Sequence, residues 1–338
     1  MKKILILKIG ALGDVVRTTY FLPGILKKYN GEAEIYWITS RNAFDLLNEN
    51  KYITKLICIE EEKELEELKK YIFDWIISLE DEEEIYIKIE NFKYKKLSGV
   101  YRNEKKLTYT KDLEVWFDMG LLSKYGKEKA DKLKKENTLS HREIFSKGLE
   151  IEILKPYFYN DVILENETAI EFKKYKKNNK TKLIGLNFNA GKRWPSKSLR
   201  EEEGKKLIRE LLKNKNNYIF LLGGKDDFEI NQELYKKFKE YEKVVFFKPC
   251  NLKKFATIIK QMNILVTSDT LALHLAIAQN IKTVSYYAPT SAIEIDTFEN
   301  GEKIISEKED YCSYKPFADN STITAEKILE KIKLKISL

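Results

Sequence analysis

The residues best suited to do chemistry lie in a short polar turn, Ser-Asp-Thr at 268–270. The turn follows Ile264–Thr267, a β-branched run that is typical of a buried parallel strand. Leu271–Gln279 consists of good helix formers, so the turn should lie at the amino terminus of a helix. Thr270 and His274 are four residues apart and would share one face of that helix.

Such a turn could bind an anion, and a phosphate in particular. A helix amino terminus presents backbone N–H groups and a partial positive charge. Asp269, Thr270 and His274 would form a polar cluster at the carboxyl end of a strand, where open α/β sheets bind their ligands. The alternative is structural: Asp269 or Thr270 caps the helix, and His274 is hydrogen-bonded inside a core. The local pattern leaves both interpretations open.

A second candidate site is the glycine turn at 10–14, which follows the strand expected at Lys3–Lys8. The turn is similar to a Rossmann phosphate loop, but Lys8 stands where the first glycine should be. The next expected strand, Glu34–Thr39, ends without the acidic residue that binds a ribose. These departures disfavour dinucleotide binding, although an NAD-dependent oxidoreductase remains an alternative.

The glycine turn places Asp14 at the carboxyl end of the strand. Asp14 would either cap the helix expected from about Val15 to Tyr29 or face a cleft as a general base. The acidic run Glu80–Glu84 could be mistaken for a metal site, but we interpret it as a solvated turn. His141 follows Ser140, a suitable helix cap, and we interpret it as structural.

Length and composition indicate a two-domain globular protein. The chain has 338 residues, 43% of them hydrophobic and 34% charged, and no apolar run approaches the length of a membrane span. The three cysteines are far apart and there are only two histidines, so neither a disulfide framework nor a zinc site is expected. The net charge of +8 is spread along the chain without a nucleic-acid-binding signature, and we expect no nucleic acid partner. Lys8 and Asp14 interrupt the apolar amino end, so we expect no signal peptide and a cytoplasmic location.

Alternating strand and helix patterns predict an α/β fold with two domains. We expect the first domain at residues 1–165 and a polar linker at 166–180. The second domain would occupy 181–322, with a terminal helix within 323–338.

Four motifs together resemble glycosyltransferase family 9, the ADP-heptose:lipopolysaccharide heptosyltransferases. They are the turn ending in Asp14, Lys192-Arg-Trp-Pro, Ser-Asp-Thr-Leu-Ala-Leu-His at 268–274, and Tyr-Ala-Pro-Thr at 287–290. Each motif alone is weak, but their order and spacing cover nearly the whole chain.

The resemblance implies the GT-B architecture, in which two Rossmann-like doubly wound domains face each other across a cleft. The first domain would bind the acceptor and the second the nucleotide sugar, and the last helix would pack back toward the first domain. The resemblance also implies the site residues. Asp14 would be the catalytic base, and Gly13 and Arg17 would contact the acceptor. The donor would be bound by Lys192, Gly223, Gly224, Asn251, Leu252, Asp269, Thr270, Leu271 and His274.

By the same resemblance, the reaction is an inverting transfer of a sugar, expected to be heptose from ADP-heptose, that needs no metal and no cofactor. The acceptor would be the lipopolysaccharide core or a related lipid-linked glycan at the cytosolic face of the inner membrane, where peripheral contact is expected. Two residues depart from the family pattern: Leu271 and Ala288 replace glycines. Leu271 would narrow the approach of the diphosphate, which favours the remaining alternative, a non-catalytic protein that binds sugar nucleotides or glycans.

Overall fold

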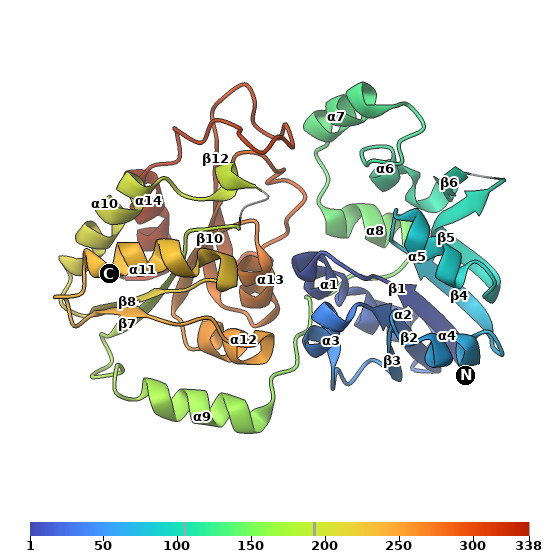
Figure 1. Ribbon diagram of the computed structural model, residues 1–338, viewed down its shortest axis with the longest axis horizontal. Helices are drawn as coiled ribbons and strands as arrows, with labels where there is room; N and C mark the ends of the chain where they lie inside the picture. Colours follow the sequence, from blue (N-terminus) through green and yellow to red (C-terminus); the bar gives the residue numbers. More distant parts are fainter. Residues whose placement is uncertain (105, 192–193, 338) are drawn as a thin grey trace. The chain divides into compact units, whose positions relative to one another are not determined.

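The computed structural model describes residues 1–104, 106–191 and 194–337. They form two compact units, each of which is an α/β layer structure around its own six-stranded sheet (Figure 1). Unit 1 contains Met1–Tyr159 and Ile293–Asp296, and unit 2 contains Asn160–Ala292 and Thr297–Leu338. The predicted Lys192 and its neighbour Arg193 lie outside the described residues.

The regular elements of unit 1 alternate between strand and helix over most of its length. Its strands are β1 (Lys2–Leu7), β2 (Ala33–Thr39), β3 (Lys55–Cys58), β4 (Ile72–Ser78), β5 (Lys93–Asn103) and β6 (Lys106–Tyr109). Its α-helices are α1 (Leu12–Thr18), α2 (Phe21–Lys28), α3 (Arg41–Leu47), α4 (Glu62–Leu68), α5 (Glu83–Ile89), α6 (Glu114–Phe117), α7 (Lys127–Glu136) and α8 (His141–Leu149).

Unit 2 repeats the alternation with longer helices. Its strands are β7 (Lys182–Asn187), β8 (Asn217–Leu221), β9 (Val244–Phe246), β10 (Ile264–Ser268), β11 (Lys282–Tyr287) and β12 (Gly301–Ile305). Its α-helices are α9 (Val162–Phe172), α10 (Glu201–Leu212), α11 (Phe228–Lys236), α12 (Leu252–Lys260), α13 (Leu271–Ala278) and α14 (Ala325–Lys335).

The two sheets share one topology. The order is β3-β2-β1-β4-β5-β6 in unit 1 and β9-β8-β7-β10-β11-β12 in unit 2. Both are the doubly wound order in which the chain reverses direction across the sheet beside its first strand. All described pairings are parallel except that of β5 with β6. The predicted α/β class with two Rossmann-like units is therefore confirmed, and the antiparallel β6 is an addition that the sequence analysis missed.

Apolar residues from both faces of the central strands build the two cores. In β1, Ile4, Leu5 and Ile6 are fully buried, and in β10 the same holds for Ile264, Leu265 and Val266. A parallel strand covered by helices on both faces must be apolar throughout, which explains why these runs do not alternate with polar residues.

The helix predicted from Val15 to Tyr29 is broken into α1 and α2. Pro23 explains the interruption, because its ring lacks an N–H and would clash with the carbonyl of Thr19 in a continuous helix. The Thr19 hydroxyl instead donates to the carbonyl of Val16, 2.7 Å away, and the chain turns there.

Two of the predicted chain segments take part in the core of unit 2. The segment predicted as a polar linker, 166–180, begins inside α9, whose Thr168 and Phe172 are fully buried. In the terminal helix α14, Ile328 and Ile332 belong to the core of unit 2, and packing of this helix toward the first domain stays a prediction. In α9, Thr168 is hydrogen-bonded to Thr257 of α12 and Phe172 stacks on Phe220 of β8. In α14, the buried residues Ile328 and Ile332 lie on one face of the helix.

None of the described helices is long and apolar enough to cross a membrane. Within the same residues, no group of three or more His, Cys, Asp and Glu side chains is arranged to hold a metal ion.

Candidate active site

The topology of unit 2 brings two candidate loops together. The strands β7 and β10 are hydrogen-bonded neighbours, and the chain leaves them in opposite directions across the sheet. The loop at 188–200 follows β7, and the turn at 269–270 follows β10. Both therefore start at the carboxyl edge beside the point where the strand order reverses, which is where α/β sheets of this topology bind ligands.

The turn after β10 holds its polar residues in defined positions. Thr270 is the N-cap residue of α13 by backbone geometry, but its hydroxyl does not cap the helix and lies 3.0 Å from the hydroxyl of Thr267. The Asn187 amide donates to both hydroxyls, at 3.1 and 3.4 Å. The structural interpretation in which the Thr270 side chain caps the helix is thus wrong, and the hydroxyl belongs to a polar cluster between β7 and β10.

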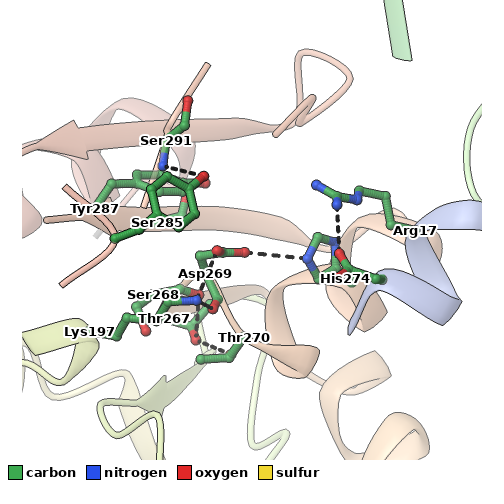
Figure 2. A network of polar contacts seen from close by, with 12 residues as sticks. Arg17, Lys197, Thr267, Ser268, Asp269, Thr270, His274, Ser285, Tyr287 and Ser291 are labelled. Carbon is green, nitrogen blue, oxygen red and sulfur yellow. Dashed lines mark hydrogen bonds and ion pairs between the residues drawn. The ribbon is translucent and has the colours of Figure 1, made fainter. Parts of the chain in front are cut away.

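His274 is buried, yet its imidazole faces the turn. Its Nε2 lies 3.5 Å from Asp269 Oδ1, and its side chain is 6% exposed (Figure 2). Asp269 receives a second contact from Lys197, whose Nζ donates to Oδ2 at 3.0 Å and to the Asp269 carbonyl at 2.9 Å. The predicted cluster of Asp269, Thr270 and His274 is therefore brought together, and it includes Lys197, which the sequence analysis did not single out.

Hydrogen bonds on both sides of residues 192 and 193 position the loop after β7. Before them, the Ala190 amide donates to the Ser198 hydroxyl at 3.3 Å, and the Gly191 amide donates to Asp227 Oδ1 at 3.2 Å. After them, the amide and the hydroxyl of Ser196 both donate to the Pro316 carbonyl. The described parts of the loop are thereby fixed to each other and to two other segments of unit 2, at Asp227 and Pro316.

Gly223 and Gly224, predicted to bind the donor, follow β8 at the same edge of the sheet. The Gly224 amide donates to Asp227 Oδ2 at 3.0 Å, so this carboxylate holds both the Gly224 turn and the Gly191 loop. Burial raises the pKa of Asp227, although the two amide bonds oppose the shift. The Gly224 N–H is thus engaged by a carboxylate of the protein itself, which the sequence pattern did not reveal.

The remaining predicted donor residues lie at the starts of two helices. Asn251 caps α12, because its side-chain oxygen accepts a hydrogen bond of 2.8 Å from the Lys254 amide. Leu252, the first residue of α12, is partly buried. Leu271 is the first residue of α13 and is also partly buried, so its side chain lies at the helix end where the family pattern has glycine.

In unit 1, the predicted base is in the first turn of α1 instead of at the N-cap, which is Ala11. The side chain of Asp14 is 40% exposed and accepts a hydrogen bond of 2.6 Å from the Arg17 guanidinium. Arg17, predicted to contact the acceptor, is 11% exposed and also lies over the ring of Trp116. Gly13, also predicted on the acceptor side, is the second residue of α1 and is partly buried. Arg17 therefore holds the Asp14 carboxylate in place, and its contact with the acceptor stays a prediction.

The loop that leads into α1, the helix of Asp14, is held by a buried ion pair. Glu80, which follows β4, accepts 2.7 Å hydrogen bonds from Lys8 Nζ and from the Ile9 amide. Burial raises the pKa of Glu80 despite these contacts. The prediction of a solvated acidic turn is wrong for Glu80, because β1 and β4 are neighbours and Lys8 lies at the same edge of the sheet.

His141 has the structural role that the sequence predicted. It is buried, and its ring stacks on Phe145 with centroids 4.1 Å apart. Ser140 forms a capping box with Glu143 at the start of α8.

Comparisons with known proteins agree with this fold. The chain resembles the crystal structure of a glycosyltransferase family 9 protein from Veillonella parvula DSM 2008, with a TM-score of 0.75, 17% identity and coverage of 99% of this chain and 97% of the other. It also resembles the E. coli ADP-heptose lps heptosyltransferase II, with a TM-score of 0.70, 16% identity and coverage of 99% and 98%. For the E. coli heptosyltransferase WaaC with ADP, the TM-score is 0.64, the identity 16% and the coverage 99% and 100%.

The comparison with curated proteins found no match. A sequence model of the family does match: residues 122–322, more than half of the chain, correspond to glycosyltransferase family 9 (heptosyltransferase). The chain therefore belongs to glycosyltransferase family 9.

Proposed function

We propose that this glycosyltransferase performs an inverting transfer of a sugar, expected to be heptose, from a nucleoside diphosphate sugar, expected to be ADP-heptose. Unit 2 binds the donor and unit 1 supplies the base and binds the acceptor. The observation that carries the proposal is the pairing of loops in unit 2, where the β7 loop and the β10 turn meet beside the reversal of strand order. Basic and polar groups gather there next to the amino terminus of α13, which suits a diphosphate.

The proposed reaction exchanges one bond for another at the anomeric carbon of the sugar. An acceptor hydroxyl attacks this carbon while its proton passes to the Asp14 carboxylate, which is partly exposed and held by Arg17. The bond from the anomeric carbon to the diphosphate breaks, and its electron pair remains on the diphosphate oxygen. The developing negative charge is stabilised by Lys192, the amino end of α13 and the Thr270 hydroxyl. Since these groups carry positive charge or donate hydrogen bonds, we propose that no metal and no cofactor is needed.

The choice of substrates rests on relatives. The names of two similar structures include ADP and ADP-heptose, and one of them is an lps heptosyltransferase. We therefore propose a lipopolysaccharide core or a related lipid-linked glycan as acceptor, reached by a cytoplasmic enzyme in peripheral contact with the inner membrane. Because the chain belongs to a glycosyltransferase family, we no longer consider the alternative of an NAD-dependent oxidoreductase.

A donor screen tests the proposal. The apparent melting temperature is measured with ADP, UDP, GDP and CDP and with their sugar conjugates, because a ligand that binds only the folded state raises stability by about 2.7 kcal/mol at one hundred times its Kd. We expect the ADP series to stabilise the protein most, and ADP-heptose to be consumed when the glycan acceptor is present, with and without EDTA.

Three results would count against parts of the proposal. Stabilisation by no nucleotide would remove the donor assignment, and loss of turnover in EDTA that Mg²⁺ restores would remove metal independence. Donor binding without either transfer or hydrolysis would favour the non-catalytic sugar-nucleotide-binding alternative, which Leu271 at the start of α13 suggests.

A further inference from the structure

We propose that Lys197 is a positioning residue, which neutralises the Asp269 carboxylate and fixes it between the β7 loop and His274. The donor part of this inference rests on the proposed function. The structural part, the dependence of His274 on Lys197 through Asp269, does not.

Lys197 is held in place by its own loop. It ends a short 3-10 turn, Pro195–Lys197, and its amide donates to the Trp194 carbonyl at 3.0 Å. The neighbouring Ser196 is tied to the Pro316 carbonyl by two hydrogen bonds. The lysine side chain is 14% exposed, so it is largely buried and its ammonium group is held beside Asp269.

Asp269 meets Lys197 with two acceptors. Its carboxylate and its own carbonyl both accept from Nζ, at 3.0 and 2.9 Å. Because Lys197 donates to both the side chain and the backbone of Asp269, it restricts the conformations of both. It thereby fixes the turn that precedes α13. Figure 2 shows Lys197 and His274 on either side of Asp269.

The second carboxylate oxygen of Asp269 faces the imidazole. Oδ1 lies 3.5 Å from His274 Nε2, and both side chains are largely buried. A carboxylate beside one ring nitrogen favours the proton on that nitrogen and sets the ring orientation. We therefore expect the tautomer of His274 in which Nε2 bears the ring proton. We expect this choice of tautomer to depend on where Lys197 holds Asp269.

The charge of Lys197 also matters for an anionic ligand. A carboxylate at the amino terminus of α13 would repel a diphosphate, and it would offset the attraction of the helix end. With Lys197 in contact, the pair carries no net charge, and the helix end and the Thr270 hydroxyl are left to attract the ligand. Lys197 would thus aid donor binding without needing to touch the donor.

The first test uses the fact that the chain has only two histidines. Nitrogen-15 spectra of the imidazole rings are recorded at one fixed pH for the wild type, Lys197→Met and Lys197→Arg. We expect the His274 ring resonances to move in Lys197→Met and to return toward the wild-type positions in Lys197→Arg. His141, which lies in unit 1 among aromatic rings, is the internal reference and should not move.

A matched control is Lys205→Met in α10. Lys205 is as buried as Lys197, at 12% exposure, and it also makes two contacts, to Glu201 and Glu202. His274 resonances that are unchanged in Lys197→Met, or that move equally in Lys205→Met, would overturn the inference. If Lys197→Met does not fold, Lys197→Gln provides the same spectroscopic comparison, because it also removes the charge that holds Asp269.

The second test measures binding of ADP by calorimetry. We expect Lys197→Met to weaken binding by about tenfold or more, Lys197→Arg to restore most of it, and Lys197→Met with Asp269→Asn to bind more tightly than Lys197→Met alone. A loss no greater than that of Lys205→Met would overturn the electrostatic role. If ADP, UDP, GDP and CDP all fail to bind the wild type, the proposed function fails, whereas the histidine spectra still decide whether Lys197 positions Asp269.

Discussion

The ion pair between Lys8 and Glu80 supports the loop that leads into α1, the helix of Asp14, and its removal should strongly reduce the stability of unit 1. Glu80 has 8% of its side chain exposed and Lys8 has 12%, so both charges are mostly removed from water. The substitution Glu80→Gln keeps the shape of the side chain and an oxygen that can accept from the Ile9 amide. It removes the negative charge and leaves the ammonium group of Lys8 buried.

Breaking a fully buried ion pair by removing one partner costs roughly 3–5 kcal/mol. The glutamine keeps the amide hydrogen bond, and some solvent reaches both groups. We therefore expect a smaller decrease in the free energy of unfolding, of about 2–3 kcal/mol. For a unit of this size, each kcal/mol lowers the melting temperature by about 2–4 °C, so the expected decrease is about 4–12 °C.

Urea unfolding followed by tryptophan fluorescence is a suitable assay, because Trp37 and Trp75 are fully buried in unit 1. The control is Glu83→Gln in the same acidic run, where the side chain is 60% exposed and pairs with Arg102. This control should change stability by less than about 0.5 kcal/mol. Equal effects of Glu80→Gln and Glu83→Gln would refute the reasoning.

Two further predictions concern unit 1. The contacts with Lys95 and with a backbone amide lower the pKa of Asp74 to about 2. The ionised Asp74 therefore stabilises the fold at a pH above its unfolded-state pKa of about 3.8, and this contribution is lost as the pH falls toward 2. The free energy of unfolding of the wild type should exceed that of Asp74→Asn by on the order of 1 kcal/mol at pH 6. Acid titrations of both proteins should show this difference vanish near pH 2, and a difference that stays constant with pH would contradict the prediction. Gly24→Ala should destabilise by about 2–3 kcal/mol in urea unfolding, because the new Cβ would lie 2.0 Å from the Glu152 carbonyl oxygen. Gly120→Ala, whose Cβ would meet its nearest atom at 3.4 Å, should cost less, and an equal cost would argue against a steric cause.

The sequence was sufficient to predict the α/β class and the strands that form the centre of each sheet. Buried parallel strands leave a direct signature of consecutive apolar residues, as in Ile264–Thr267. The edges were harder. The strand β12, Gly301–Ile305, is short and has a polar half. The break between α1 and α2 depends on Pro23, but proline also occurs in the first turn of continuous helices, so its presence alone does not predict a break.

The candidate site was predicted where its residues are close in the chain. Asp269, Thr270 and His274 lie within six positions, and helical geometry is enough to place Thr270 and His274 on one face. Contacts between distant residues were missed. Lys197 and Asp269 are brought together only by the pairing of β7 with β10, and Glu80 is buried only because β4 lies beside β1. A topology prediction in the doubly wound order would have placed both pairs at a shared edge, so that signal was available in principle.

The measurement that tests the central claim most directly is the rate of sugar transfer by Asp14→Asn, together with its affinity for the donor. Asparagine keeps the size of the side chain and cannot act as a base. Our account predicts donor binding within about twofold of the wild type and transfer reduced by about 10²–10⁴. Transfer within a few-fold of the wild-type rate, with the donor still bound, would contradict the assignment of Asp14 as the base.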